Sequence, residues 1–440
     1  MTFLQKSSLT LVTRIGGFAL GFLVQVWISR ALGPAGKGEY AIFTLVPALL
    51  AQLAGSGIYN ANIYLLGKGR ADFKSAAENT FTFSLLASAA LVVFYALTRT
   101  WFDRVMFKSL PPEVTTWFFY ALPLNLLFLS FNYLALARDD FFSFNLPNLT
   151  RPALVLLGLL VLASAGAMSL QHAVMVWVAA SLVLALHSWW LLFQRERFGL
   201  GWHRALFRES LRFGWQSHLG TVFYYLGWRL DFILCNLYLD AKQVGNYSIA
   251  ALVGEVLWFI PNTFSVVLLP QISRMEKERA ENLTEQVCRL TLLTSALGAL
   301  LVAASAPLLV PLIFGKDFSP AVLPLLLLLP GMIMESGTRI LTSFLVGRGF
   351  PMTTSLSAML VAVSNLLLNL WALPHYGIAG AAVAGTISYT LGAIYLLHSF
   401  QRMTGISYPR LWLLQPSDFH LLRQVWLRIK STRNDDQSPA

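Results

Sequence analysis

Six ionisable side chains lie inside segments that are otherwise apolar. The three cations are Arg14, Arg229 and Arg339, and the three acids are Asp231, Glu255 and Glu335. An ionised group in an apolar medium is costly, so each of these side chains is a candidate for function. Three guanidinium groups around one cavity could bind a diphosphate, because the planar guanidinium fork matches phosphate oxygens. We therefore predict a cationic substrate site.

The same six groups could instead neutralise one another. Glu335 and Arg339 are four residues apart with the acid first, an order that favours a pair on one helix face. Arg229 and Asp231 are two residues apart, so their side chains face different sides of a helix and each needs a partner elsewhere. Arg14 could pair with Glu255, which would leave no net charge.

Two pairs of asparagines have the spacing of one helix face. They are Asn125 with Asn132 and Asn365 with Asn369. Each pair could contact the hydroxyl groups of a sugar, or could simply form hydrogen bonds between helices.

The sequence indicates neither a metal site nor a cofactor. Cys235 and Cys288 stand at unrelated positions and are expected to pack in the core. Arg138-Asp139-Asp140 resembles a metal-binding carboxylate pair, but it falls at the end of an apolar segment, where a solvated turn is common. The glycines of residues 33–38 lack the spacing of a nucleotide-binding loop, so we expect no ATP hydrolysis by this chain.

Composition places these groups in a membrane. Hydrophobic residues make up 56% of the chain and charged residues 12%, about half of the roughly 25% that is usual in soluble domains. We predict an all-α, polytopic membrane protein. The net charge of +11 is then better explained by loops that face an anionic leaflet than by nucleic acid.

Twelve segments are long and apolar enough to cross a bilayer as helices. They lie near residues 8–30, 39–66, 77–98, 115–137, 149–167, 171–194, 213–238, 246–270, 288–312, 320–346, 352–373 and 377–400. Loops on the side of the N-terminus carry about three times as many Lys and Arg residues as loops on the other side, which places both termini in the cytoplasm.

A weak internal repeat predicts two related lobes. Gly38–Tyr40 follows one apolar segment and begins another, and Gly245–Tyr247 does the same in the second half. We therefore expect lobes at 1–194 and 213–401.

The segments between and after the lobes are amphipathic. Residues 195–212 have the pattern of a linker helix on the membrane surface, and residues 408–430 repeat that character within a cytoplasmic tail at 402–440. The end of the tail has the composition of a disordered segment.

Four stretches resemble a known family. They are ISRALGPAGKGEYAIF, RLDFILCNLYLDAKQVGNYSIA, PLIFGKDFSPAVLPLLLLLPGM and NLLLNLWALPHYGIAGAAVAGTISY. With these motifs the chain resembles the polysaccharide-precursor flippases, the Wzx-type branch of the multidrug/oligosaccharidyl-lipid/polysaccharide (MOP) exporter superfamily. The resemblance implies two six-helix lobes around a central cavity.

The resemblance also implies an activity and its partners. Such proteins move an undecaprenyl-diphosphate-linked oligosaccharide from the cytoplasmic to the external leaflet of a bacterial inner membrane. Their glycans include O-antigen, lipopolysaccharide and exopolysaccharide, and a polysaccharide polymerase and chain-length machinery act afterwards. On this interpretation the three buried acids could couple the cycle to protons.

Other interpretations remain. Cation-coupled multidrug exporters of the same superfamily generally need an acid buried in the first lobe, whereas Glu39 and Glu78 lie at span ends. Lipid II flippases typically add two helices after the twelfth. A membrane glycosyltransferase or ligase usually carries a large external loop, and the longest one here, near residues 98–114, is too short to be a domain.

Overall fold

The computed structural model describes residues 3–412 and residue 415, and every regular element in that part of the chain is helical. The N-terminal lobe contains α1 (Phe3–Ala54), α2 (Ile58–Gly67), α3 (Phe73–Val105), α4 (Pro112–Thr115), α5 (Phe118–Ala137), α6 (Phe141–Ser164) and α7 (Leu170–Arg195). The C-terminal lobe contains α8 (Arg204–Tyr238), α9 (Ala241–Gly254), η1 (Glu255–Trp258), α10 (Phe259–Ile272), α11 (Lys277–Phe314), η2 (Lys316–Ala321), α12 (Val322–Gly347) and α13 (Pro351–Thr404), and the short helix α14 (Tyr408–Trp412) follows.

These helices account for the twelve predicted spans. Within the described residues, nine helical segments are long and apolar enough to cross a membrane. Two of them, α1 and α13, each cover parts of two predicted spans, which meet at Gly33 (φ 67°) and Gly377 (φ 56°), and the span predicted at 39–66 continues past α1 into α2. Positive φ angles are accessible to glycine at little cost, so each chain reversal falls on a residue that permits it. The helix α8 supplies the remaining span.

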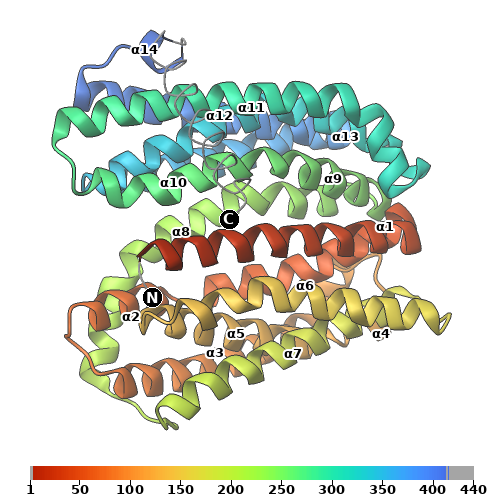
Figure 1. Ribbon diagram of the computed structural model, residues 1–440. Coiled ribbons are helices and arrows are strands. Elements are labelled where there is room, and N and C mark those ends of the chain that lie inside the picture. The colour runs from red at the N-terminus through yellow and green to blue at the C-terminus, as the bar shows by residue number, and fades with distance from the viewer. Residues whose placement is uncertain (1–2, 413–414, 416–440) are drawn as a thin grey trace, which may run out of the picture.

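The helices run between two ends of the molecule (Figure 1). We call one the basic end, because its loops at residues 68–72, 138–140, 196–203, 273–276 and 348–350 each contain at least one Lys or Arg residue, and further Lys and Arg residues lie in the helical turns beside them. The opposite end holds the reversals at Gly33 and Gly377 and the loops at 106–111 and 239–240.

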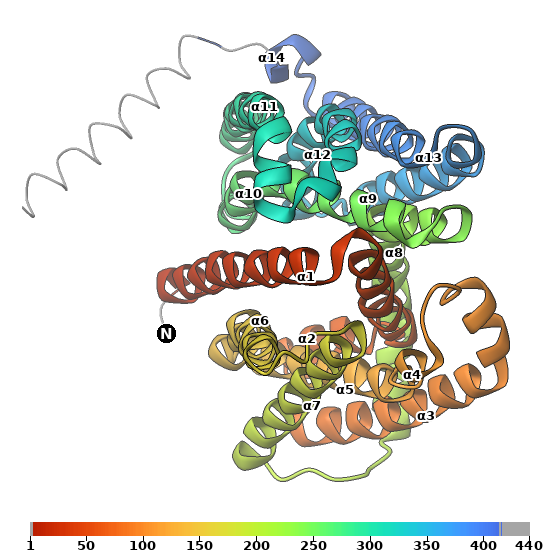
Figure 2. The ribbon, with the colours of Figure 1, turned by 90° about the vertical axis from the view of Figure 1, so that its right-hand side faces the viewer.

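Two long helices lie between the lobes. Viewed from the opposite end, the first half of α1 crosses between the N-terminal helices and the C-terminal helices (Figure 2). The helix α8 runs alongside both groups of helices. Phe18 of α1 packs edge-on against Phe259 of α10, with ring centroids 4.4 Å apart. The first half of α8 packs on α2, where the rings of Tyr64 and Phe213 stack at 4.1 Å.

The two copies of the Gly-x-Tyr repeat meet at the opposite end. A Cβ atom on Gly38 would lie 2.0 Å from the carbonyl oxygen of Ala241, and one on Gly245 would lie 1.9 Å from that of Pro34. Each glycine therefore packs against the carbonyl group four residues before the other glycine. We call this contact of residues 34–38 with residues 241–245 the glycine seam. It relates the lobes by approximate twofold symmetry, as in an isologous interface.

Hydrogen bonds close the same end around the seam. The guanidinium group of Arg30 donates to the carbonyl groups of Leu312 and Ile313, the latter at 2.7 Å from Nε. Lys108 Nζ donates to the carbonyl oxygen of Leu237 at 3.2 Å, and Asn236 Nδ2 donates to that of Met106 at 2.8 Å. The lobes are thus joined at the opposite end.

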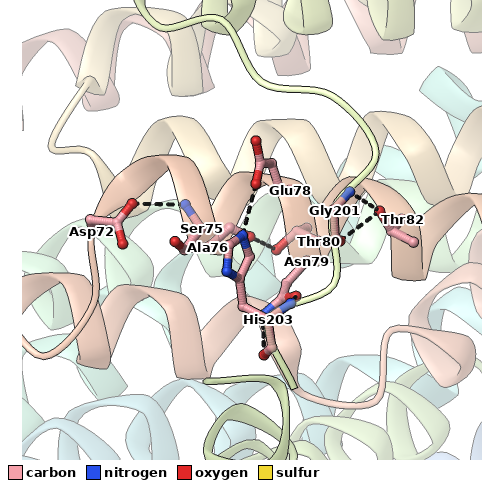
Figure 3. A network of polar contacts seen from close by, with 9 residues as sticks. All are labelled: Asp72, Ser75, Ala76, Glu78, Asn79, Thr80, Thr82, Gly201 and His203. Carbon is pink, nitrogen blue, oxygen red and sulfur yellow. Dashed lines mark hydrogen bonds and ion pairs between the residues drawn. The ribbon is translucent and has the colours of Figure 1, made fainter. Parts of the chain in front are cut away.

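The loop between the lobes is bound to α3 (Figure 3). The backbone N–H of Gly201 donates to Thr82 Oγ1 at 3.1 Å, and the Thr82 hydroxyl donates to the Gly201 carbonyl at 2.9 Å. The backbone N–H of His203 donates to Asn79 Oδ1 at 2.7 Å, and Asn79 Nδ2 donates back to the His203 carbonyl at 3.2 Å. His203 Nε2 lies 2.7 Å from Glu78 Oε2.

This loop corrects the prediction of a separate surface helix within residues 195–212. Residues 196–203 form no helix, and the helix that begins at Arg204 continues unbroken to Tyr238 as α8. Hydrogen bonds to α3 and packing on α2 hold this region against the N-terminal lobe. Of the predicted amphipathic tail, the structure describes α14, and the rest lies outside the described residues.

We expect Gly38→Ala to lower the melting temperature of the purified protein by several degrees. The new methyl group meets a backbone carbonyl that cannot rotate away, and overpacking of this kind costs about 1–3 kcal/mol. Gly21→Ala is the control, because Gly21 lies on the same helix with open space around it. Equal melting temperatures for the two variants would show that the seam is loosely packed.

Asn79→Ala is expected to increase tryptic cleavage after Arg197 and Arg204 several-fold. The variant removes both hydrogen bonds that hold the backbone of His203, so the loop should open more often. Leu86→Ala, at an exposed position on α3, should leave the cleavage rate unchanged. The rates are read from a time course on an electrophoresis gel.

Candidate functional site

Two cavities border different faces of α8. The large cavity, about 520 Å³, lies among α8, α10, α12 and α13 and takes Asn60 from the N-terminal lobe. The side chains that line it include Tyr224, Trp228, Trp258, Asn262, Glu335 and Arg339. The seam cavity, about 250 Å³, lies between α1 and the α8–α9 pair, beside the glycine seam. The side chains that line it include Gln25, Lys37, Tyr225, Arg229 and Glu255.

Arg339 is the charged centre of the large cavity. Its Nη2 lies 3.7 Å from Glu335 Oε1, so the predicted pair on one helix face is confirmed. Arg339 Nη1 also donates to Asn262 Oδ1 at 2.7 Å, and the guanidinium lies 4.6 Å from the Trp258 ring centroid. Its buried Nε has no hydrogen-bond partner among the described residues. Glu335 thus balances the charge of Arg339 in this cavity.

Aromatic rings form one wall of the large cavity. The ring centroids of Trp228 and Trp258 are 6.0 Å apart, and Tyr389 meets Trp258 edge-on at 6.2 Å. The cavity extends from these rings to Pro351 and Ser355, which lie near the basic end. An aromatic lining with a few polar groups is typical of sites for organic ligands.

Arg229 and Glu255 form an ion pair in the seam cavity. Arg229 Nη1 lies 3.0 Å from Glu255 Oε1, and the guanidinium lies 4.0 Å from the Trp228 ring centroid. The alternative prediction that Arg14 pairs with Glu255 is therefore wrong. Helix geometry explains this, because η1 places Glu255 beside α8, whereas Arg14 is exposed on the first half of α1.

The three arginines of the predicted cationic site do not line one cavity. Arg229 lines the seam cavity and Arg339 the large cavity, while Arg14 lines neither. Asp231, which was expected to need a partner, accepts hydrogen bonds from the Tyr247 hydroxyl and from the backbone N–H of Phe232. It is 4% exposed and lines neither cavity.

The asparagines of both pairs form hydrogen bonds inside the helical bundle, between helices at Asn132 and within one helix at Asn369. Asn132 Nδ2 donates to the carbonyl oxygen of Phe144 at 3.0 Å. Asn369 Nδ2 donates to Asn365 Oδ1 at 3.0 Å, and both side chains are fully buried. Neither these three nor Asn125 lines either of the two cavities.

Arg151 is a half-buried cation that the sequence analysis missed. Its Nη2 donates to Asn125 Oδ1 at 3.2 Å and to Ser181 Oγ at 3.1 Å, and its guanidinium lies 4.9 Å from the Trp177 ring centroid. The predicted span began at residue 149 and so placed Arg151 at its edge. Because α6 begins at Phe141, Arg151 lies about three turns into the helix.

Lys37 was missed for the same reason. The sequence placed it in an external turn, but the helix resumes directly after Gly33, so Lys37 lies within the glycine seam, one residue before Gly38. Its side chain is 4% exposed and lines the seam cavity. The informative signal is its position immediately before Gly38, the first residue of the repeat.

The cysteines and acids of the described chain hold no metal site. Cys235 and Cys288 are buried and free, which confirms their prediction as packing residues. Within the described ranges, no group of three or more His, Cys, Asp and Glu residues could bind a metal ion.

Comparisons with known proteins agree with this architecture. A family model described as "Polysaccharide biosynthesis protein" matches residues 27–323. Two relatives come from Haloferax volcanii: a probable low-salt glycan biosynthesis flippase, Agl15, is 25% identical over 211 residues, and a probable flippase, AglR, is 24% identical over 202 residues. The alignments cover 47% and 43% of this chain but only 43% and 41% of the relatives, so the chain spans less than half the length of these curated relatives.

Solved structures share the fold. The lipid II flippase MurJ in an inward closed conformation superposes with a TM-score of 0.74 and 16% identity, over 98% of this chain and 99% of that one. An inward-facing multidrug resistance MATE family transporter of the MOP superfamily gives 0.74 and 13%, over 91% and 98%. The likeness confirms the predicted fold class, an all-α membrane protein with two related six-helix lobes.

We expect Glu255→Ala to lower the melting temperature more than Arg229→Ala does. The first variant leaves Lys37 and Arg229 without an acid in the lining of the seam cavity, whereas the second leaves one cation, Lys37, and one acid, Glu255, in that lining. An unbalanced buried charge is the more costly outcome. Adding Lys37→Met should restore part of the stability of Glu255→Ala, and the absence of any restoration would show that Lys37 does not act on this cavity. Thermal unfolding in detergent provides the measurement.

Proposed function

The chain belongs to the family of polysaccharide biosynthesis proteins, and from this premise we propose that it flips a polyprenyl-diphosphate-linked oligosaccharide across a membrane by alternating access. Membership in the family agrees with the resemblance that the four sequence motifs indicated. In the proposed cycle, the head group enters from the cytoplasmic leaflet and leaves toward the external leaflet, while the lipid tail stays in the bilayer.

One observation supports this proposal most strongly. The large cavity extends toward the basic end, while the glycine seam joins the lobes at the opposite end. Loops rich in Lys and Arg usually face the cytoplasm, so the cavity would receive its ligand from the cytoplasmic side. Both termini would then be cytoplasmic, and the membrane would be the inner membrane of a bacterium.

The lining of the large cavity suits a glycan. Sugar rings present apolar C–H faces and polar hydroxyl edges, and Trp228 and Trp258 offer flat aromatic surfaces for the faces. Asn60, Asn262 and Arg339 line the same cavity and offer hydrogen bonds for the edges. The glycan would serve surface polysaccharides such as O-antigen of lipopolysaccharide or exopolysaccharide, and a polymerase with chain-length machinery would use the product.

The charges of the large cavity favour this activity over drug export. A cationic drug needs an acid that is free to bind it or to exchange a proton. Glu335 is held by Arg339 and also accepts a hydrogen bond from the Thr338 hydroxyl at 2.8 Å. A neutral or anionic ligand rich in hydroxyl groups fits such a cavity better than a cation does.

The proposal is tested by the leaflet in which lipid-linked repeat units accumulate. Deleting the gene should trap complete units on the cytoplasmic side of spheroplasts, where a membrane-impermeant sugar-modifying reagent cannot reach them. Complementation with Arg339→Ala should restore export about tenfold less well than the intact gene, because a hydrogen bond to a charged group contributes about 1.5–3 kcal/mol. Trp258→Ala should be similarly impaired.

Arg104→Ala is the matched control, since Arg104 is exposed and lies outside both cavities. Normal external repeat units in the deletion strain, together with new sensitivity to cationic drugs, would assign the protein to drug export instead.

A further inference from the structure

We propose that residues 406–412, which include α14 and which we call the strap, position α12 and with it the charged centre of the large cavity. The strap follows the last long helix of the C-terminal lobe and returns to α11 at the basic end (Figure 1). The inference rests on the proposed function only where it concerns transport, because the contacts of the strap do not depend on the identity of the ligand.

A buried ion pair on α11 binds the strap. Glu285 is 3% exposed, and its Oε1 lies 3.4 Å from Nε of Arg410, which belongs to the strap. Arg289, one turn further along α11, pairs with Glu285 and also donates from Nη1 to the carbonyl oxygen of Arg410 at 2.6 Å. A buried ion pair needs additional hydrogen bonds to offset the loss of hydration. The strap supplies one to the acid and one to the cation.

Apolar side chains of the strap complete the core of the C-terminal lobe at the basic end. Leu411 is fully buried and Ile406 is nearly so, and both belong to one cluster with side chains of α10, α11, α12 and α13. The hydroxyl oxygen of Tyr408 lies 2.8 Å from His398 Nδ1 on α13. The strap therefore joins α11, α12 and α13 near the ends of these helices.

Trp412 brings the strap next to the wall of the large cavity. It lines a small cavity of about 10 Å³ together with Cys288 of α11 and Thr338 of α12. Thr338 also lines the large cavity, and its hydroxyl donates to Glu335 Oε2 at 2.8 Å. Glu335 in turn pairs with Arg339. Protein interiors are closely packed, so the space that Trp412 fills fixes the position of this face of α12.

The internal repeat relates the strap to the loop between the lobes. Glu78 of α3 contacts His203 of that loop (Figure 3), and Glu285 of α11 contacts Arg410 of the strap. Glu78 and Glu285 are 207 residues apart in sequence, as are His203 and Arg410 and also the two glycines of the seam. Each lobe thus binds the segment after its last long helix to an acid on its third span. The strap is therefore part of the repeated architecture rather than an appended tail.

Cys288 reports whether the strap is in place, because it is 1% exposed and lines the cavity beside Trp412. In the full-length Cys235→Ala variant it is the only thiol. Its modification by a maleimide in nanodiscs should be about threefold faster in Arg410→Ala and about tenfold faster in Trp412→Ala, because a buried thiol reacts when its cover opens. Arg410→Lys and Trp412→Phe should retain the slow rate. Arg402→Ala, at an exposed arginine in the last turn of α13, is the matched control.

The position of α12 is tested with a thiol in the large cavity, in the variant Cys235→Ala/Cys288→Ala/Thr342→Cys. Thr342 lies on α12 and lines that cavity. Adding Trp412→Ala should raise the rate of maleimide modification several-fold, because α12 loses the side chain that holds its other face, and Trp412→Phe should keep the rate low. Adding Gly38→Ala instead controls for a general loss of stability, and should leave the rate unchanged.

Transport is measured in the deletion strain complemented with each variant. Trp412→Ala should export repeat units several-fold less well than the intact gene, because a displaced α12 moves the acid that holds Arg339. Trp412→Phe should restore export, since a second aromatic ring fills most of the same space. Normal export by Trp412→Ala, in a strain where deletion traps the units, would overturn the inference.

The inference and the proposed function can fail separately. Equal rates at Cys288 in Arg410→Ala, Trp412→Ala and the parent chain would overturn the inference even if Arg339→Ala traps repeat units. A faster rate at Cys288 with an unchanged rate in Thr342→Cys would also overturn it, because the strap would then cover the lobe without positioning α12. Both thiol results as expected, in a protein whose deletion leaves repeat units outside, would overturn the proposed function and leave the strap in place.

Discussion

The approach of two backbones at Gly38 and Gly245 is the contact on which the arrangement of the lobes depends. A side chain on either residue would occupy the position of a carbonyl group of the other lobe, so the distance between α1 and α9 is set by the absence of Cβ atoms. The tyrosines of the two repeats, Tyr40 and Tyr247, are buried just behind the contact. Helices that approach this closely gain van der Waals contact in a medium where the hydrophobic effect contributes little between them.

The helix α8 transmits this arrangement to the rest of the molecule. Its first half is bound to the N-terminal lobe, where Gly214 and Gly57 are also in backbone contact. Its second half packs on α13, where Gly227 lies against Val361. One face of α8 borders the large cavity and another borders the seam cavity. A movement of one lobe relative to the other must therefore alter both cavities, which gives a physical basis for coupling between a ligand and the closure of one end.

The two cavities differ in charge as well as in position. In the large cavity, Glu335 compensates Arg339, and aromatic rings dominate the wall. In the seam cavity, Glu255 compensates only one of two cations. Most other buried charges serve the structure itself, as Asp231 does by accepting a hydrogen bond from Tyr247 and Glu285 does by pairing with Arg289.

The sequence by itself determined the class of protein, the number of spans and the repeat, because apolar length, the distribution of Lys and Arg, and glycine at a reversal are local properties. It also determined the Glu335–Arg339 pair, whose partners share one helix face. The tertiary structure alone decided which charges meet between helices. Arg229 pairs with Glu255, Arg14 stays exposed, Lys37 becomes buried and Arg151 becomes half-buried. The pattern of hydrophobicity places a span boundary only to within a few residues, and one turn of helix is enough to move a lysine or an arginine from the solvent into the interface between lobes.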